Sequence, residues 1–188
     1  MMKIFKYLVI LVVYFTLGWA AESSDKWVPD GIIKGEEYSH TINLVKDRLV
    51  LHYKIDSTYI YFGIEVKSLG WSAIGFEPDK GMKNADIILI FIENDSLKVL
   101  DSYSTGIYGP HRSDKELGGQ DNILDVGGRV DSTGYVVEFK RMLNSKDKFD
   151  KPLIKGKELT LIYAMAKSHN IKKKHDLYRG SIKIKLVD

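Results

Sequence analysis

The feature of this sequence that most constrains the fold is a series of short apolar or alternating segments, each ended by turn-forming residues. Such short segments are typical of β-strands, whereas an amphipathic helix repeats its apolar positions over a longer stretch. The predicted strands cover residues 48–55, 59–66, 87–92, 97–103, 123–126, 135–140, 159–166 and 181–187. The best candidate for a helix is short, at residues 145–150. Many strands joined by turns predict one all-β domain, a sandwich or a barrel.

Two of the predicted strands indicate which of their faces meet water. The run 87–92 is continuously apolar, as expected of a strand that is buried on both faces. In the last strand Ile182, Ile184 and Leu186 alternate with two lysines. Because successive side chains of a strand point to opposite faces, we expect this strand in an antiparallel sheet with one solvated face.

The first 21 residues have the order of a secretory signal peptide. A positively charged start is followed by 13 uncharged residues at 7–19, and then by Ala20 and Ala21. This stretch is typical of a signal peptide and is short of the roughly 20 apolar residues that span a membrane. An uncleaved segment that tethers the domain is the alternative. We expect a single domain at 22–188 that acts outside the cytoplasm, in the periplasm or the extracellular space.

Composition excludes some function classes. Without residues 1–21 the formal net charge falls from +3 to +1, because the segment holds two lysines and no acidic residue. A nearly neutral domain offers no electrostatic reason to bind nucleic acid. The chain has no cysteine, so it has neither a disulfide nor a thiol nucleophile, and no C-x-x-C-H haem attachment motif. Stability is expected to come from packing and from a bound cofactor.

No catalytic signature is present, and we therefore predict a protein that is not an enzyme. The sequence contains no G-x-S-x-G, H-E-x-x-H or G-x-G-x-x-G motif. Residues 104–122 form the longest stretch without a strand pattern, and loops of that length are often functional. The five histidines, at positions 40, 52, 111, 169 and 175, show no metal-binding spacing by themselves.

Several acidic residues crowd the predicted loops. They are Asp79, Asp86, Asp114, Asp121 and Asp125. Carboxylates and carbonyl oxygens are the ligands of hard cations, but this spacing matches no calcium loop. We expect most of these acids to form turns.

One pair of segments is distinctive. Residues 70–76 read GWSAIGF, and residues 81–89 read GMKNADIIL. Together with segments at 101–104, 119–123, 139–150, 162–164 and 175–180, in that order, the chain resembles the DOMON family from about residue 30 to residue 186. The resemblance implies an immunoglobulin-like antiparallel β-sandwich of roughly ten strands. It also implies a ligand site at one end, filled by b-type haem in some members and by sugars in others.

The resemblance further implies two axial haem ligands. Cytochrome members use a methionine that matches Met82 and a histidine that matches His175. His169 is the rival for the second position, but His175 is preferred because residues 178–181 follow it as they do in the family. A thioether and an imidazole together fill both axial positions of the iron, which suits electron transfer.

Other residues are expected around this site. The candidates for its apolar wall are Trp71, Phe76, Ile88, Tyr163 and Met165. Lys172, Lys173 and Lys174 are expected either in water or against haem propionates or an acidic redox partner.

We therefore predict an exported b-type cytochrome domain that binds haem b non-covalently. Its expected partner is a redox protein or a membrane electron-transfer complex. A carbohydrate- or small-ligand-binding module is the alternative, in which Trp27, Trp71 or Tyr108 stacks on a sugar ring. A third interpretation is an accessory subunit of a redox or membrane complex.

Overall fold

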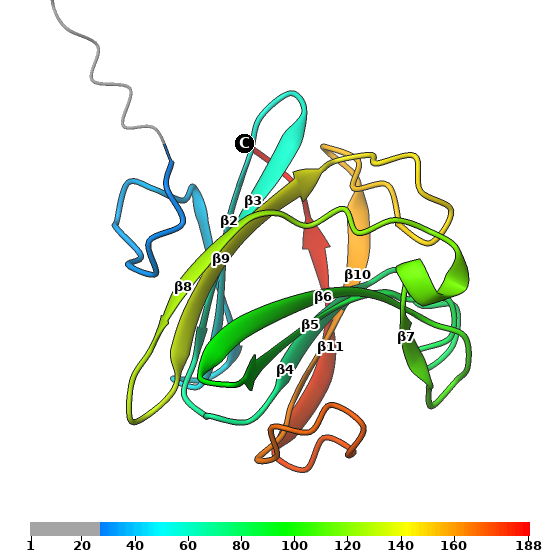
Figure 1. Cartoon of the computed structure of the whole chain (residues 1–188). Coiled ribbons are helices and arrows are strands. Elements are labelled where there is room, and N and C mark those ends of the chain that lie inside the picture. Colours follow the sequence, from blue (N-terminus) through cyan, green and yellow to red (C-terminus); the bar gives the residue numbers. More distant parts are fainter. Residues whose placement is uncertain (1–26) are drawn as a thin grey trace, which may run out of the picture.

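The computed structural model describes residues 27–188, and the predicted signal peptide lies outside these residues. The described part contains eleven β-strands and one short 3-10 helix (Figure 1). The elements are β1 (His40–Val45), β2 (Leu49–Ile55), β3 (Tyr59–Val66), β4 (Ser72–Phe76), β5 (Asp86–Glu93), β6 (Ser96–Ser104), β7 (His111–Ser113), η1 (Lys115–Leu117), β8 (Leu124–Val130), β9 (Tyr135–Met142), β10 (Glu158–Met165) and β11 (Tyr178–Lys185). This described part contains no helix that is long and apolar enough to cross a membrane.

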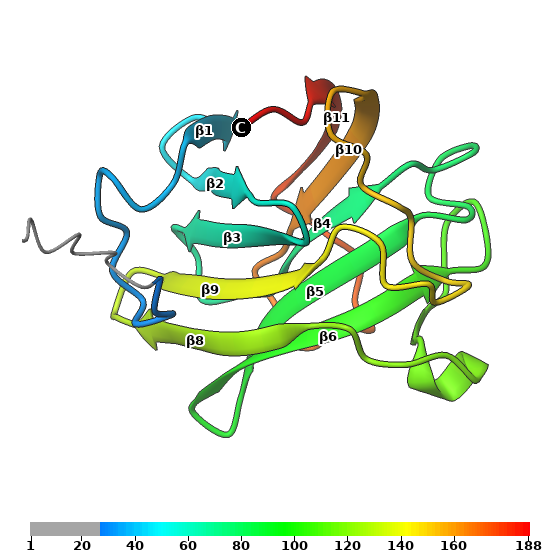
Figure 2. The ribbon, with the colours of Figure 1, turned by 90° about the horizontal axis from the view of Figure 1, so that it is seen from above.

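The strands form two antiparallel sheets. The five-stranded sheet has the order β1-β2-β3-β9-β8, and the six-stranded sheet has the order β11-β10-β4-β5-β6-β7. Figure 2 shows the two sheets as separate layers. The predicted all-β sandwich is thereby confirmed, with eleven strands in place of about ten.

Each of the eight predicted strands is present, and the alternation of the last one is confirmed. Ile184 and Leu186 are buried, whereas Lys183 and Lys185 are exposed. Strands β1, β4 and β7 are additional to these eight, and β7 and η1 lie inside the predicted long loop.

The helix predicted at residues 145–150 is wrong. This segment has no regular structure, and Lys146 has a left-handed φ of 68°. The hydroxyl of Ser145 accepts a hydrogen bond from the Asp147 amide, and the Asp147 carboxylate accepts one from the Phe149 amide. Serine and aspartate side chains that bind nearby backbone amides in this way compete with helix formation.

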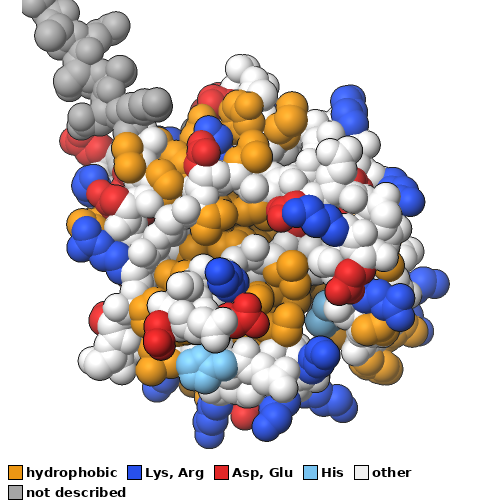
Figure 3. Space-filling view, in the orientation of Figure 1, with side chains coloured by type: hydrophobic (Ala, Val, Ile, Leu, Met, Phe, Trp, Pro, Cys, Tyr) orange, Lys and Arg blue, Asp and Glu red, His pale blue; other side chains and the backbone are white. Residues whose placement is uncertain are grey.

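The main core lies between the two sheets. Phe62 and Phe139 of the five-stranded sheet pack together with ring centroids 5.2 Å apart, and Phe76 of the other sheet lies 6.0 Å from Phe62. In Figure 3 hydrophobic side chains occupy the centre of the view, and lysines and arginines lie mainly around its edge.

Strand β5 is buried on both faces, as predicted. Ile88 and Ile90 belong to the core between the sheets, whereas Ile87 and Leu89 belong to a second apolar cluster. Because successive side chains of a strand alternate, this second cluster lies on the outer face of the six-stranded sheet. The outer face is therefore apolar as well.

Candidate functional site

The outer face of the six-stranded sheet has a floor of small and branched apolar residues. The register pairs Ala164 of β10 with Ala73 of β4, and Ala73 with Leu89 of β5. Beside this row, a methyl group added at Gly75 would lie 3.0 Å from both Ile162 and Ile87. A sheet face that only met water would carry polar side chains. An apolar floor needs a cover, and Ile171 of the segment before β11 packs against it.

His175 lies at one end of this face. Its ring is 6.3 Å from that of Trp71, in an edge-to-face arrangement at 71°. The Trp71 amide donates to the Ser168 carbonyl, and the Leu177 amide donates to the Met165 carbonyl. These bonds hold both ends of the segment that carries His175 against the sheet.

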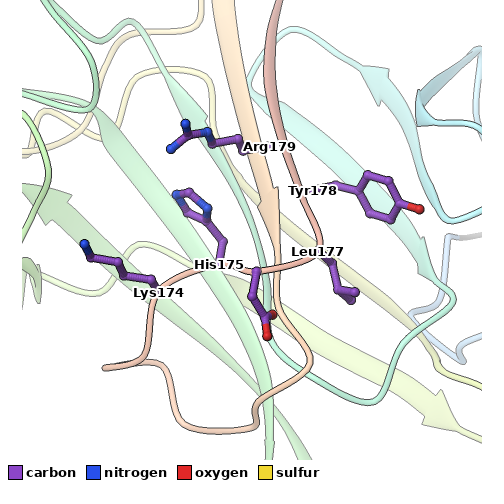
Figure 4. Close-up of a pocket in the computed structure, with 6 residues that line it drawn as sticks. Lys174, His175, Leu177, Tyr178 and Arg179 are labelled. Carbon is purple, nitrogen blue, oxygen red and sulfur yellow. The ribbon is translucent and has the colours of Figure 1, made fainter.

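A pocket of about 350 Å³ surrounds His175 and is lined by residues 174–179. Figure 4 shows the side chains of Lys174, His175 and Arg179 on one side of the backbone, with Tyr178 on the other. Burial lowers the pKa of His175, and the positive charges of Arg179 and Lys174 lower it further. The imidazole is therefore held in its neutral form, which is the form that binds metals.

Met82 lies in the loop between β4 and β5 and is half-buried. Its amide donates to the Ile107 carbonyl at 3.0 Å. Gly81 has a φ of 60°, and a methyl group there would lie 2.7 Å from the same carbonyl oxygen, so glycine allows the two loops to meet. The position of Met82 is thus set by backbone contacts between two loops.

The two predicted ligands approach from opposite ends of the sheet. Met82 lies just before β5, which begins at Asp86. His175 lies just before β11, which begins at Tyr178. Across the sheet, the strand register aligns Tyr178 with Ile90 of β5. Asp86 and Ile90 are four positions apart, or about 13 Å at the rise of a strand. The apolar floor lies between these two levels.

His111 is a candidate that the sequence did not single out. The backbone of His111 pairs with Ser104 of β6. Ser104 is in turn hydrogen-bonded through its backbone to the loop that carries Met82. The Nδ1 of His111 is buried and has no hydrogen-bond partner among the described residues. Burial lowers the pKa of His111, and the charge of His175 lowers it further. The only signal in the sequence was its place in the long loop at 104–122.

The structure does not bring all the predicted wall residues together. Trp71 lies on the outer face, but Phe76 is fully buried between the sheets, where the Arg141 guanidinium lies 5.9 Å from its ring. Tyr163 also packs against the inner core, over Gly180. His169 is exposed and lines a different groove, with Phe91 and Ile171 among its neighbours.

The aromatic residues considered for sugar binding differ in exposure. Trp71 is only 3% exposed, and Trp27 packs on Tyr61 while its indole donates to the Tyr38 hydroxyl. Tyr108 is 90% exposed and follows Ile107, the residue that holds the Met82 loop. Of these three rings, Tyr108 has a face that is open to water.

These features define an antiparallel β-sandwich whose six-stranded sheet has an apolar outer face, flanked by the loops that carry Met82 and His175. The chain belongs to the DOMON family, because the sequence model of the DOMON domain matches residues 45–166, more than half of the chain.

Known relatives and solved structures agree with this membership. The chain is 29% identical over 163 residues to DBH-like monooxygenase protein 1 of Mus musculus, and 24% identical over 156 residues to MOXD1 homolog 1 of Drosophila melanogaster. The aligned regions cover 82% and 77% of this chain but only 25% and 22% of those relatives. The fold is similar to that of the cytochrome domain of Myriococcum thermophilum cellobiose dehydrogenase, with a TM-score of 0.59, 13% identity, and coverage of 85% of this chain and 88% of that one.

Proposed function

We propose that this domain binds b-type haem non-covalently, with Met82 and His175 as the axial ligands, and that it transfers electrons. The observation that supports the proposal is that the Met82 loop and the segment with the neutral imidazole of His175 lie at opposite ends of the six-stranded sheet, whose outer face is apolar. When bound with these two ligands, haem supplies one-electron chemistry and leaves no open position for oxygen activation.

The residues around the two donors fit such a group. The floor between the two donors is apolar, with the small side chains of Ala73 and Ala164, and Trp71 supplies an aromatic edge beside His175. Arg179 and Lys174 line the same pocket as His175, so they are placed to bind carboxylates such as propionates. The chain's role in this proposal is to bind, orient and desolvate the group, and it carries out no reaction alone.

Export and assembly belong to the same proposal. The N-terminal segment directs the domain to the periplasm or the extracellular space, where it exchanges electrons with a redox protein or a membrane electron-transfer complex. Because the chain spans about a quarter of its known relatives, a role as one module of a larger redox assembly is included.

Absorbance spectroscopy tests the proposal. The purified domain is titrated with haemin and then reduced, and sharp low-spin Soret and α-bands are expected. Met82→Ala and His175→Ala should each convert the spectrum to a five-coordinate form, because each removes one axial donor. His169→Ala is the matched control, since His169 lies in a different groove, and it should leave the low-spin spectrum unchanged.

The remaining outcomes decide between ligands. If His111→Ala loses the low-spin bands and His175→Ala retains them, His111 replaces His175 as the axial ligand. If haemin does not bind at all, the cytochrome proposal fails.

A carbohydrate-binding module is the second candidate, favoured by the open ring of Tyr108 beside the Met82 loop. Aromatic faces in water stack on sugar rings. Glycan-array binding that is lost in Tyr108→Ala would support it, and the absence of binding to any glycan would exclude the sugars tested.

A further inference from the structure

A buried group of carboxylates lies at the end of the six-stranded sheet where the Met82 loop joins β5. Asp86 begins β5, Asp101 lies in β6, and Asp150 lies in the loop before β10. One carboxylate oxygen from each lies within 4.8 Å of the others. Asp114, between β7 and η1, is also buried, and its amide donates to the Asp101 carbonyl at 3.1 Å. We call these four residues the acidic cluster.

One arginine lies among these acids. Arg141 is fully buried, and its guanidinium lies 2.8 Å from Asp86 and 3.6 Å from Asp150. If all four acids are ionised, this single guanidinium leaves three negative charges uncompensated. An uncompensated buried charge costs several kcal/mol, so proteins neutralise such groups with protons, partners or metal ions.

Six carboxylate oxygens of the acidic cluster are buried without a hydrogen-bond partner among the described residues. They are Oδ1 of Asp86, Oδ1 of Asp101, and both oxygens of Asp114 and Asp150. The other oxygens are bound: Oδ2 of Asp86 accepts from Arg141 and from the Lys151 amide, and Oδ2 of Asp101 accepts from the Asn122 amide. Because native interiors satisfy nearly all their buried polar atoms, this concentration of free acceptors calls for a bound cation or for protons.

The pKa values of these acids reflect the same lack of positive charge. Burial raises the pKa of Asp101 to about 7 and that of Asp114 to about 8, and neighbouring carboxylates add to both shifts. Without a cation, these two acids would therefore hold protons close to neutral pH.

We propose that the acidic cluster binds a hard divalent cation of the calcium class. Its donors are all oxygens, and two oxygens bound to one Ca²⁺ at 2.3–2.6 Å are at most about 5 Å apart, in line with the 4.8 Å span of three of them. Mg²⁺ usually retains several waters, for which a site with fully buried donor atoms leaves little room.

The ion would join segments that are distant in the sequence. Asp150 belongs to the loop after β9, Asp86 and Asp101 belong to the sheet, and Asp114 follows β7 beside them. A cation bound by Asp86, Asp101 and Asp150 would clamp the loop after β9 onto this end of the sandwich, and it would stabilise the fold whether or not haem binds.

Calcium titration of the haem-free domain at pH 8 tests the site. After treatment with EDTA, isothermal calorimetry should show saturable Ca²⁺ binding, and Ca²⁺ should raise the melting temperature by several degrees. Asp101→Asn should abolish both effects, because Asp101 supplies one of the three convergent oxygens. In EDTA this variant should melt at or above the wild-type temperature, because it removes one buried charge.

Asp121→Asn is the matched control, because Asp121 is an exposed acid that pairs with Lys115 in the same part of the chain. It should retain the full calcium response. If Asp101→Asn does not fold, calorimetry on the wild type still decides. The absence of binding heat and of a melting shift at millimolar Ca²⁺ would overturn the proposal in favour of shared protons. An equal response to Mg²⁺ would overturn the assignment to calcium.

Discussion

Arg141 offers the sharpest test of how the buried charges inside this sandwich compensate one another. The guanidinium is fully buried, pairs with Asp86 at 2.8 Å and donates to the Lys151 carbonyl at 3.2 Å. Arg141→Met keeps an apolar chain of similar shape but leaves Asp86 without its counter-charge. Removing one partner of a buried ion pair typically costs about 3–5 kcal/mol. For a domain of this size, that corresponds to a fall of roughly 6–20 °C in melting temperature.

The stability that Arg141→Met loses should depend on pH in a defined direction. Burial already raises the pKa of Asp86 above its ordinary value, and Arg141 opposes this shift. Without Arg141 the folded pKa of Asp86 rises further, so folding takes up a proton at pH values between the unfolded pKa of 3.8 and this raised folded pKa. A group whose folded pKa is raised loses its contribution to stability as pH rises. The cost of Arg141→Met should therefore be smaller at pH 5 than at pH 7.5.

Urea unfolding in EDTA, followed by tryptophan fluorescence at both pH values, measures this effect. Arg112→Met is the control, because Arg112 is exposed on β7 and should change stability by less than about 0.5 kcal/mol. The double variant with Asp86→Asn should recover part of the loss, because it removes the stranded charge. A loss below about 1 kcal/mol at pH 7.5, or one that is equal at both pH values, would refute the reasoning.

Two further predictions concern the same interior. The wild-type domain in EDTA should lose stability as pH rises from about 4 to 8, because Asp101 and Asp114 have folded pKa values of about 7 and 8, above their ordinary 3.8. Melting temperatures recorded across this range check the sign, and a steady rise in stability would contradict it. Phe139→Ala should cost about 3–5 kcal/mol, because the ring is fully buried against Phe62 and its loss leaves a cavity. Phe139→Leu should cost less in the same denaturation assay, and equal losses would show that the cavity is not the cause.

The strands were predictable because their pattern is local. In β11 the alternation of Ile182 and Ile184 with lysines reflects backbone geometry that any extended chain shares. The helix predicted at residues 145–150 failed because Ser145 and Asp147 use their side chains to bind backbone amides, an effect that apolar periodicity does not show.

The site was predictable only in part. Trp71 and Phe76 belong to the same distinctive segment, yet one lies on the outer face of the sheet and the other in the core. His111 showed no partner in the sequence, because its neighbours on the outer face come from other strands and loops. The family resemblance indicated Met82 and His175 as a pair, and whether they bind one iron stays a prediction.

The sequence by itself determined that this chain forms many short strands, that β5 is buried on both faces, and that its pattern is that of a DOMON domain. Each of these depends on residues that are close along the chain. Tertiary structure alone decided that Asp86, Asp101 and Asp150 converge beside Arg141, and that His111 lies beside the strand end that is hydrogen-bonded to the Met82 loop. The reason is that strand register and the packing of loops against the sheets bring these groups together, and both arise from contacts between residues that are far apart in the sequence.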